Sequence, residues 1–229
     1  MNFQFSKYQT ATAIAVLFHA IGLLGILFFN RQFFVQATAL NLLLMFLLLV
    51  WTQKEKNGFF LLFVAAAIAL GLAAEIIGVN TGALFGDYSY GNLLGPKFMK
   101  VPLIIGINWF VIIYCCGISI HTLLMKAISR ISFETKTKPM ALKAISVIVD
   151  GASIAVFFDW IMEPVAVKLG YWKWHDGTVP FYNYVCWLMV SNIILAIFHF
   201  SRFNKQNKFA VNLLLIQMMF FLLLRTFLN

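Results

Sequence analysis

Long apolar stretches separated by short polar segments make up almost the whole chain. A helix needs about 20 mostly apolar residues to cross roughly 30 Å of hydrocarbon. Seven stretches of about this length can be marked, at about 10–29, 33–51, 59–79, 101–125, 144–165, 181–200 and 209–228. The pattern predicts an all-α integral membrane protein, with a single transmembrane domain over residues 1–229 built as a bundle of about seven transmembrane helices with two long outer loops.

Composition and cysteine usage agree with this class. Of the residues, 62% are hydrophobic and only 11% are charged, whereas ordinary soluble domains carry roughly 25% charged residues. The first apolar stretch exceeds the roughly 7 to 15 residues of a signal-peptide core, so we expect it to be retained as a helix. The three cysteines lie inside apolar stretches and lack metal-site or disulfide spacing, which favours a role as small core residues.

The net charge of +9 is explained by topology rather than by nucleic acid, because the basic residues crowd the short loops. Eleven Lys and Arg residues fall on one side of the predicted bundle and six on the other. The richer side holds Lys7, Lys54, Lys56, Lys126, Arg130, Lys136, Lys138, Lys143, Arg202, Lys205 and Lys208. Cytoplasmic loops carry the excess of basic residues, so we expect a cytoplasmic N-terminus, an outer C-terminus, contact with membrane lipid and no nucleic-acid partner.

Four of the eight acidic residues fall inside apolar stretches, where a charge costs at least about 2.5 to 3.5 kcal/mol. Asp159 and Glu163 are four residues apart and share one helix face, and Pro164 marks the helix end or a kink. Glu75 lies near the outer end of its own stretch, on the same membrane side as Glu163. We therefore expect these three carboxyls to converge, either as a catalytic group or as a hydrogen-bonded packing network. Asp150 lies about half a revolution away and reads as a structural partner between helices.

Each of the two outer loops carries an aromatic pair with one residue between. The first pair is Tyr88 and Tyr90, and the second is Trp172 and Trp174. Each pair follows an acid-bearing stretch and precedes a Val-Pro step and a tryptophan seven residues later. This order predicts a possible parallel repeat of residues 59–125 and 144–200. Aromatic residues near span ends are also typical of the membrane interface, which is the alternative interpretation.

The residue set favours proton chemistry over metal or retinal chemistry. The last apolar stretch has no lysine for a retinal Schiff base, and the four histidines do not form a metal-ligand set, so we expect neither metal nor cofactor. Two neighbouring buried carboxyls can share one proton near neutral pH, which places a proton donor beside a carboxylate. Tryptophan and tyrosine faces can stabilise a cation. This combination suits protonation of an isoprenoid double bond to a tertiary carbocation, followed by capture with water.

Two segments carry a resemblance to a known family. "EIIGVNTGALFGDYSYGNLLGPKFMKVPLIIGINWF" and "DWIMEPVAVKLGYWKW" followed by "VPFYNYVCW" resemble the carotenoid biosynthesis family of membrane hydratases, which includes gamma-carotene 1'-hydroxylases and bisanhydrobacterioruberin hydratases. The resemblance implies addition of water, without a cofactor, to the C-1,2 double bond of an acyclic psi end group, giving a tertiary 1-hydroxy carotenoid. A lipophilic carotenoid and water would be the reactants, and a bacterial inner membrane the location.

The resemblance implies acids at Glu75, Asp87, Asp159 and Glu163, where the family carries aspartate more often at the last position. We expect Asp159 or Glu163 to protonate the terminal alkene, and its neighbour or Glu75 to deprotonate the attacking water. Asp87 would stand at the mouth of the site. The remaining candidates for binding the substrate are Tyr88, Tyr90, Asn108, Trp109, Trp160, Trp172, Trp174, Asn183 and Trp187.

Two other functions fit the same pattern. A carotenoid cyclase of the lycopene type begins with the same protonation but captures the cation with an internal double bond. A non-enzymatic membrane transporter also uses acids within the membrane and repeated units. The pigment product separates the three, because hydration adds the mass of one water, cyclisation leaves the mass unchanged and a transporter leaves the pigment unaltered.

Overall fold

The computed structural model describes residues 6–131 and 140–228. Within them the chain forms eight helices and four short strands. The helices are α1 Lys7–Phe28, α2 Arg31–Gln36, α3 Thr38–Thr52, α4 Gly58–Thr81, α5 Ile104–Ile131, α6 Met140–Lys168, α7 Phe181–Phe200 and α8 Lys208–Phe227. The strands are β1 Tyr88–Tyr90, β2 Lys97–Phe98, β3 Val101–Pro102 and β4 Trp172–Trp174.

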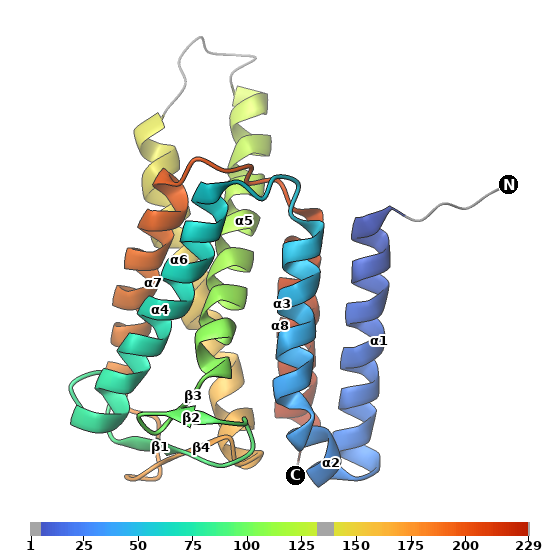
Figure 1. Ribbon diagram of the computed structural model, residues 1–229, viewed down its shortest axis with the longest axis vertical. Coiled ribbons are helices and arrows are strands. Elements are labelled where there is room, and N and C mark those ends of the chain that lie inside the picture. Colours follow the sequence, from blue (N-terminus) through green and yellow to red (C-terminus); the bar gives the residue numbers. More distant parts are fainter. Residues whose placement is uncertain (1–5, 132–139, 229) are drawn as a thin grey trace, which may run out of the picture.

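The helices confirm an all-α membrane protein. Among the described residues, six helices are long and apolar enough to cross a membrane, and α3 is a shorter apolar helix of 15 residues. The helices run side by side along the long axis of the molecule (Figure 1). One boundary differs from the prediction: the stretch predicted at 33–51 is divided into α2 and α3 at Ala37. The N–H of Ala37 donates to the carbonyl oxygens of Phe33 and Val35, which closes α2 before α3 begins.

Helix α5 forms the centre of the bundle. Every residue from Trp109 to Cys116 is fully buried, in agreement with the prediction that two of the cysteines fill the core. The Tyr114 hydroxyl donates to Gln53 Oε1 at 2.5 Å and accepts from Asn207 Nδ2 at 3.1 Å. These bonds tie α5 to the segment after α3 and to the residue that caps α8.

The four strands gather at one end of the bundle, below α4 to α7 in Figure 1. Strands β1 and β4 pair antiparallel, and β2 pairs antiparallel with β3. At the end of β1 the Gly91 N–H donates to the Tyr171 carbonyl oxygen at 2.8 Å. A Cβ atom at Gly91 would stand 2.4 Å from the Gly170 carbonyl oxygen, so the two strand ends meet only because residue 91 has no side chain.

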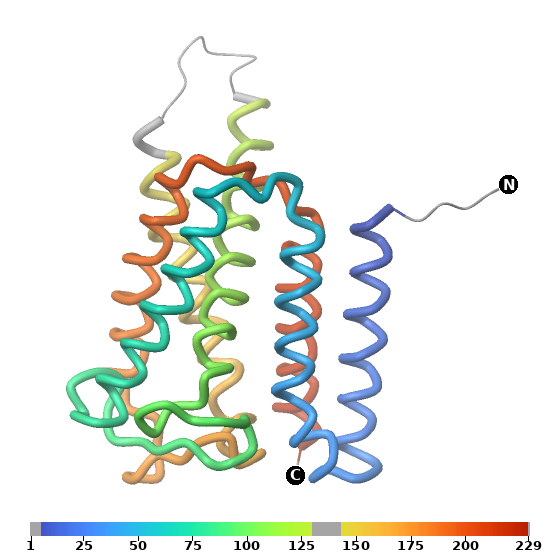
Figure 2. Tube along the Cα trace, in the orientation of Figure 1, coloured from blue at the N-terminus to red at the C-terminus, as the bar shows by residue number. Residues whose placement is uncertain are grey.

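The two strand-bearing segments have equivalent places in the chain path. Figure 2 shows that one links α4 to α5 and the other links α6 to α7, both at the same end of the bundle. Helix α1 begins at the opposite end, and α8 ends on the strand side (Figure 1). Lys136 and Lys138 of the predicted basic side lie outside the described residues.

Candidate functional site

Three carboxyl groups meet in one cavity between the strands and the helices. Glu75 comes from α4, and Asp159 and Glu163 come from one face of α6. Their residues are 5%, 0% and 3% exposed. The sequence prediction that these three side chains converge is therefore confirmed, and we call this space the acid cavity. The acid cavity has a volume of about 20 Å³.

Glu75 accepts hydrogen bonds from three aromatic side chains. The hydroxyls of Tyr88 and Tyr90 donate to Oε2 at 2.5 and 2.8 Å, and Trp109 Nε1 donates to Oε1 at 2.9 Å. Burial raises the pKa of Tyr88 and of Tyr90, and the nearby charge of Glu75 raises both further. Both tyrosines therefore remain neutral donors at any ordinary pH. The three donors together provide partners for both oxygens of the Glu75 carboxyl group.

Glu163 is held in a matching way by the second aromatic pair. Trp172 Nε1 and Trp174 Nε1 both donate to Oε2, at 3.0 and 2.9 Å. The β1–β4 register places Tyr88 opposite Trp174 and Tyr90 opposite Trp172. Alternate residues of a strand point to the same face, so all four aromatic side chains face the acid cavity. One short ladder thus supplies donors to two different acids.

Asp159 has the fewest partners of the three acids. Asn183 Nδ2 from α7 donates to Oδ2 at 2.8 Å, whereas Oδ1 is buried with no hydrogen-bond partner. A buried water needs roughly 10 to 15 Å³ and two to four polar partners. The acid cavity, at about 20 Å³, therefore has room for one water beside Asp159.

Aromatic rings close the acid cavity toward the centre of the bundle. Trp109 and Trp187 stack with ring centroids 4.0 Å apart and planes 17° from parallel. A Cβ atom at Gly71 of α4 would stand 2.4 Å from Trp109 Cβ, so the absence of a side chain at Gly71 lets Trp109 pack against α4. The stack presents indole rings to a space that contains carboxyl groups, an arrangement able to stabilise a cation.

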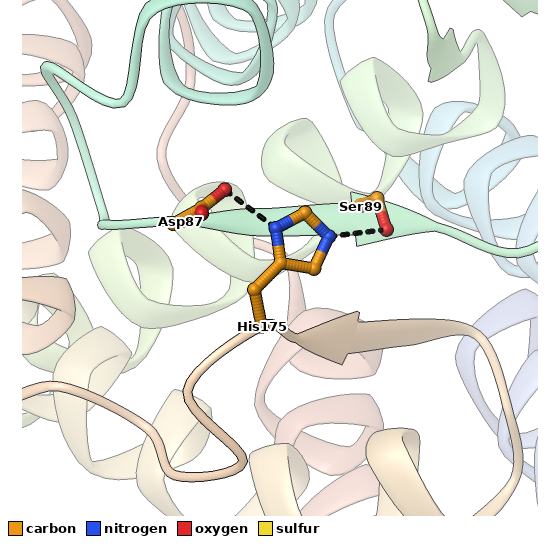
Figure 3. A network of polar contacts seen from close by, with 3 residues as sticks. All are labelled: Asp87, Ser89 and His175. Atoms are coloured by element: carbon orange, nitrogen blue, oxygen red, sulfur yellow. Dashed lines mark hydrogen bonds and ion pairs between the residues drawn. The ribbon is translucent and has the colours of Figure 1, made fainter.

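Eleven of the thirteen predicted site residues line the acid cavity, including Asn108, and two do not. Asp87 is exposed at the strand end of the molecule, where its Oδ1 lies 2.7 Å from His175 Nδ1. Ser89 Oγ lies 3.2 Å from His175 Nε2 on the other side of the ring. Figure 3 shows the His175 ring between these two residues. The three side chains join the segment of β1 to the residue after β4, so the placement of Asp87 favours holding the strands together.

Trp160 and Asp150 also lie away from the acid cavity. Trp160 is 45% exposed on the surface of α6, and the Arg225 guanidinium lies 4.1 Å from the centroid of its ring. Arg225 Nη1 also donates to the Trp160 carbonyl oxygen at 2.9 Å. Asp150 is exposed on α6, so it is not buried between helices.

Three cavity residues were not predicted from the sequence. Phe85, Ile105 and Met162 complete the lining of the acid cavity. Ordinary apolar residues of this kind give no signal in a membrane sequence. Within the described ranges, no group of three or more His, Cys, Asp or Glu residues is arranged to hold a metal ion.

A second cavity of about 70 Å³ adjoins the acid cavity. Asn41 Oδ1 and Gln217 Oε1 line it and are buried without a partner. His19 lines it as well, and its Nδ1 lies 2.8 Å from the Ala15 carbonyl oxygen. These polar residues within apolar helices were the available sequence signal for this cavity. Its volume is sufficient for waters that would satisfy the two amide oxygens.

Comparison with known proteins gives one family and one relative. Residues 33–229 match the carotenoid biosynthesis protein family. The chain is also similar to bisanhydrobacterioruberin hydratase of Haloarcula japonica, with 25% identity over 143 residues. This match covers 59% of the chain and 44% of the relative, so the chain spans less than half the length of that protein. No solved structure matches the chain.

Proposed function

Because the chain belongs to the carotenoid biosynthesis protein family, we propose that it is a carotenoid hydratase, a hydro-lyase that works without a cofactor. It adds water to the C-1,2 double bond of an acyclic psi end group and forms a tertiary 1-hydroxy carotenoid. The similarity to a protein named as a hydratase supports the reaction class. The chemistry of the acid cavity supports the role of each residue.

The observation that carries the proposal is the position of Asp159. Its side chain is fully buried, one oxygen has no partner, and Glu163 lies one helical turn away on the same face. An unpaired ionised carboxyl group is costly in such a place, whereas a protonated carboxyl group can donate its proton to a bound substrate. Asp159 is therefore assigned as the proton donor.

The first chemical step forms a carbocation. The proton of Asp159 passes to C-2 of the end group, the π bond supplies its electron pair to the new C–H bond, and C-1 becomes a tertiary cation. Asp159, Glu75 and Glu163 and the Trp109–Trp187 stack surround this charge. Preorganised charges and ring faces of this kind stabilise a developing cation without reorganising at the moment of reaction.

The second step captures the cation with water. The water oxygen bonds to C-1, and Glu163 accepts the proton that the water loses. Transfer of this proton to Asp159, one turn along α6, restores the starting state, so the cycle consumes only the alkene and one water.

We further propose that the end of the bundle that bears the strands faces the outside of a bacterial inner membrane. The basic residues favour a cytoplasmic N-terminus by eleven to six. This orientation puts the acid cavity near the outer leaflet. We also propose that residues 59–125 and 144–200 form a parallel repeat. The two aromatic pairs that meet in the β1–β4 ladder support this repeat.

Expression in a host that makes lycopene tests the function. We expect new pigments whose mass exceeds that of lycopene by one or two waters, detected by chromatography and mass spectrometry. Isomeric pigments would indicate a cyclase, and unaltered lycopene would indicate a non-enzymatic role. Either result would remove the hydratase proposal.

A further inference from the structure

The acid cavity adjoins the second cavity, and the two spaces share part of their lining. Ile105, Asn108, Met162 and Trp172 line both spaces. Met162 is an unbranched, adaptable side chain of the kind that yields to a passing ligand. Trp172 forms the wall on the strand side and donates to Glu163. A ligand that reaches the acids from the second cavity therefore passes the residues that hold them.

The second cavity in turn adjoins a third, more open cavity. His19, Thr38, Asn41 and Phe220 line both of them. The third cavity has a volume of about 310 Å³ and lies among α1, α2, α3 and α8. The three cavities thus form a row that begins at the acids and ends at the other side of the bundle.

The outer end of this row has a lipid-like lining. Phe18, Ile21, Phe33 and Leu40 line the third cavity and are 47%, 48%, 62% and 71% exposed. Phe18 and Ile21 belong to α1, which is long and apolar enough to cross a membrane, and Leu40 belongs to the shorter apolar helix α3. The opening therefore faces hydrocarbon, where a long apolar molecule is dissolved, rather than the aqueous outer face.

From this adjacency we infer that the row of cavities opens into a lateral channel that takes the linear hydrocarbon part of a long isoprenoid from the bilayer. The inference rests on the proposed function for the identity of the reacting end. The end group enters between α1 and α3, passes the second cavity and reaches Asp159. The rest of the chain then lies in the second and third cavities, among apolar side chains that replace its contacts with lipid.

The Tyr171 and Thr38 hydroxyls mark the structural link between channel and site. Their oxygens lie 2.6 Å apart and both residues line the second cavity. Tyr171 directly precedes β4, whose tryptophans hold Glu163. One continuous segment, residues 171–174, therefore lines the channel and also carries the two tryptophans that donate to Glu163.

The test measures lycopene binding by the purified protein in detergent. Bound lycopene is detected as visible absorption that co-elutes with the protein. Gly22→Trp fills the third cavity from α1; the first Cβ contact at Gly22, with Phe220 Cε2, is an ordinary 3.7 Å. Ala20→Trp adds the same side chain to the exposed face of the same helix and is the matched control. Ala37→Trp blocks the third cavity from the α2–α3 junction. It is a second, independent variant, so the test still stands if Gly22→Trp fails to fold.

We expect Gly22→Trp and Ala37→Trp to bind lycopene about tenfold more weakly or worse, with Ala20→Trp equal to the unaltered protein. Equal binding by Gly22→Trp and Ala20→Trp, in proteins of equal thermal stability, would overturn the channel. So would the absence of lycopene from the unaltered protein. Because binding is measured apart from conversion, lycopene that binds in the channel but stays unconverted would refute the hydratase proposal alone.

Discussion

Tyr88 and Trp174 lie directly opposite each other in the β1–β4 ladder, with ring centroids 5.1 Å apart, and each donates a hydrogen bond to a different carboxyl group. Tyr88 donates to Glu75, and Trp174 donates to Glu163. A pair of facing strand residues therefore sets the positions of acids on two separate helices. A slip of one residue in this register would turn the aromatic side chains away from both acids.

The buried tyrosines predict a specific loss of stability at alkaline pH. In the unfolded chain Tyr88 and Tyr90 ionise near pH 10, whereas in the folded protein burial and the charge of Glu75 hold their pKa values above the usual range. Above about pH 10 the folded state binds more protons than the unfolded state, so the unfolding free energy falls as pH rises. Below that pH these residues add no pH dependence.

Melting temperatures measured in detergent from about pH 8 to 11 test this expectation. The unaltered protein should lose stability above about pH 10 more steeply than the variant with both Tyr88→Phe and Tyr90→Phe. The variant should start from a lower stability, since each lost bond to a charged group costs roughly 1.5 to 3 kcal/mol. Parallel pH curves for the two proteins would show that these tyrosines ionise normally.

The Trp109–Trp187 stack predicts a graded effect on the rate. Trp109 also donates to Glu75, so Trp187 is the cleaner residue to replace. Trp187→Leu removes a ring face worth about 2 kcal/mol toward a desolvated cation, which corresponds to roughly a thirtyfold fall in kcat. Trp187→Phe keeps a ring and should fall less. Both should bind lycopene normally, and equal rates for the Leu and Phe variants would contradict cation stabilisation.

The exposed contact between Asp87 and His175 predicts that replacing either residue changes conversion only slightly. Their side chains are 69% and 44% exposed, and pairs at such positions contribute roughly 0 to 1 kcal/mol to stability. Asp87→Asn and His175→Ala should therefore keep conversion within about threefold of the unaltered protein. A loss at Asp87 as large as the loss at Asp159 would instead support a direct catalytic role for Asp87.

Helical periodicity accounts for what the sequence could predict about the site. The spacing of Asp159 and Glu163 placed both on one face of α6, and alternating topology brought Glu75 to the same end of the bundle. The same period places Trp160 about 100° round the helix from Asp159, which agrees with its exposure. Trp160 therefore lies outside the acid cavity, and its role in binding the substrate stays a prediction.

The pairing of β1 with β4 lay beyond the sequence evidence. It joins residues more than 80 positions apart in two loops of different length, and two strands of three residues carry no local signal for a partner. Their similar aromatic pairs indicated a repeat, yet did not show that one pair would face the other. The repeat itself stays a prediction. One asymmetry bears on it: the position four residues before Glu163 is Asp159, whereas four residues before Glu75 stands Gly71.

Conversion of lycopene by the unaltered protein and by Asp159→Asn, at equal levels in the membrane, tests the central claim most directly. The amide keeps the size and the contact with Asn183 but has no proton of suitable acidity to give. The account predicts hydrated pigment from the unaltered protein and at least about a hundredfold less from Asp159→Asn, the usual scale of general acid catalysis. Equal hydration by both proteins would contradict it.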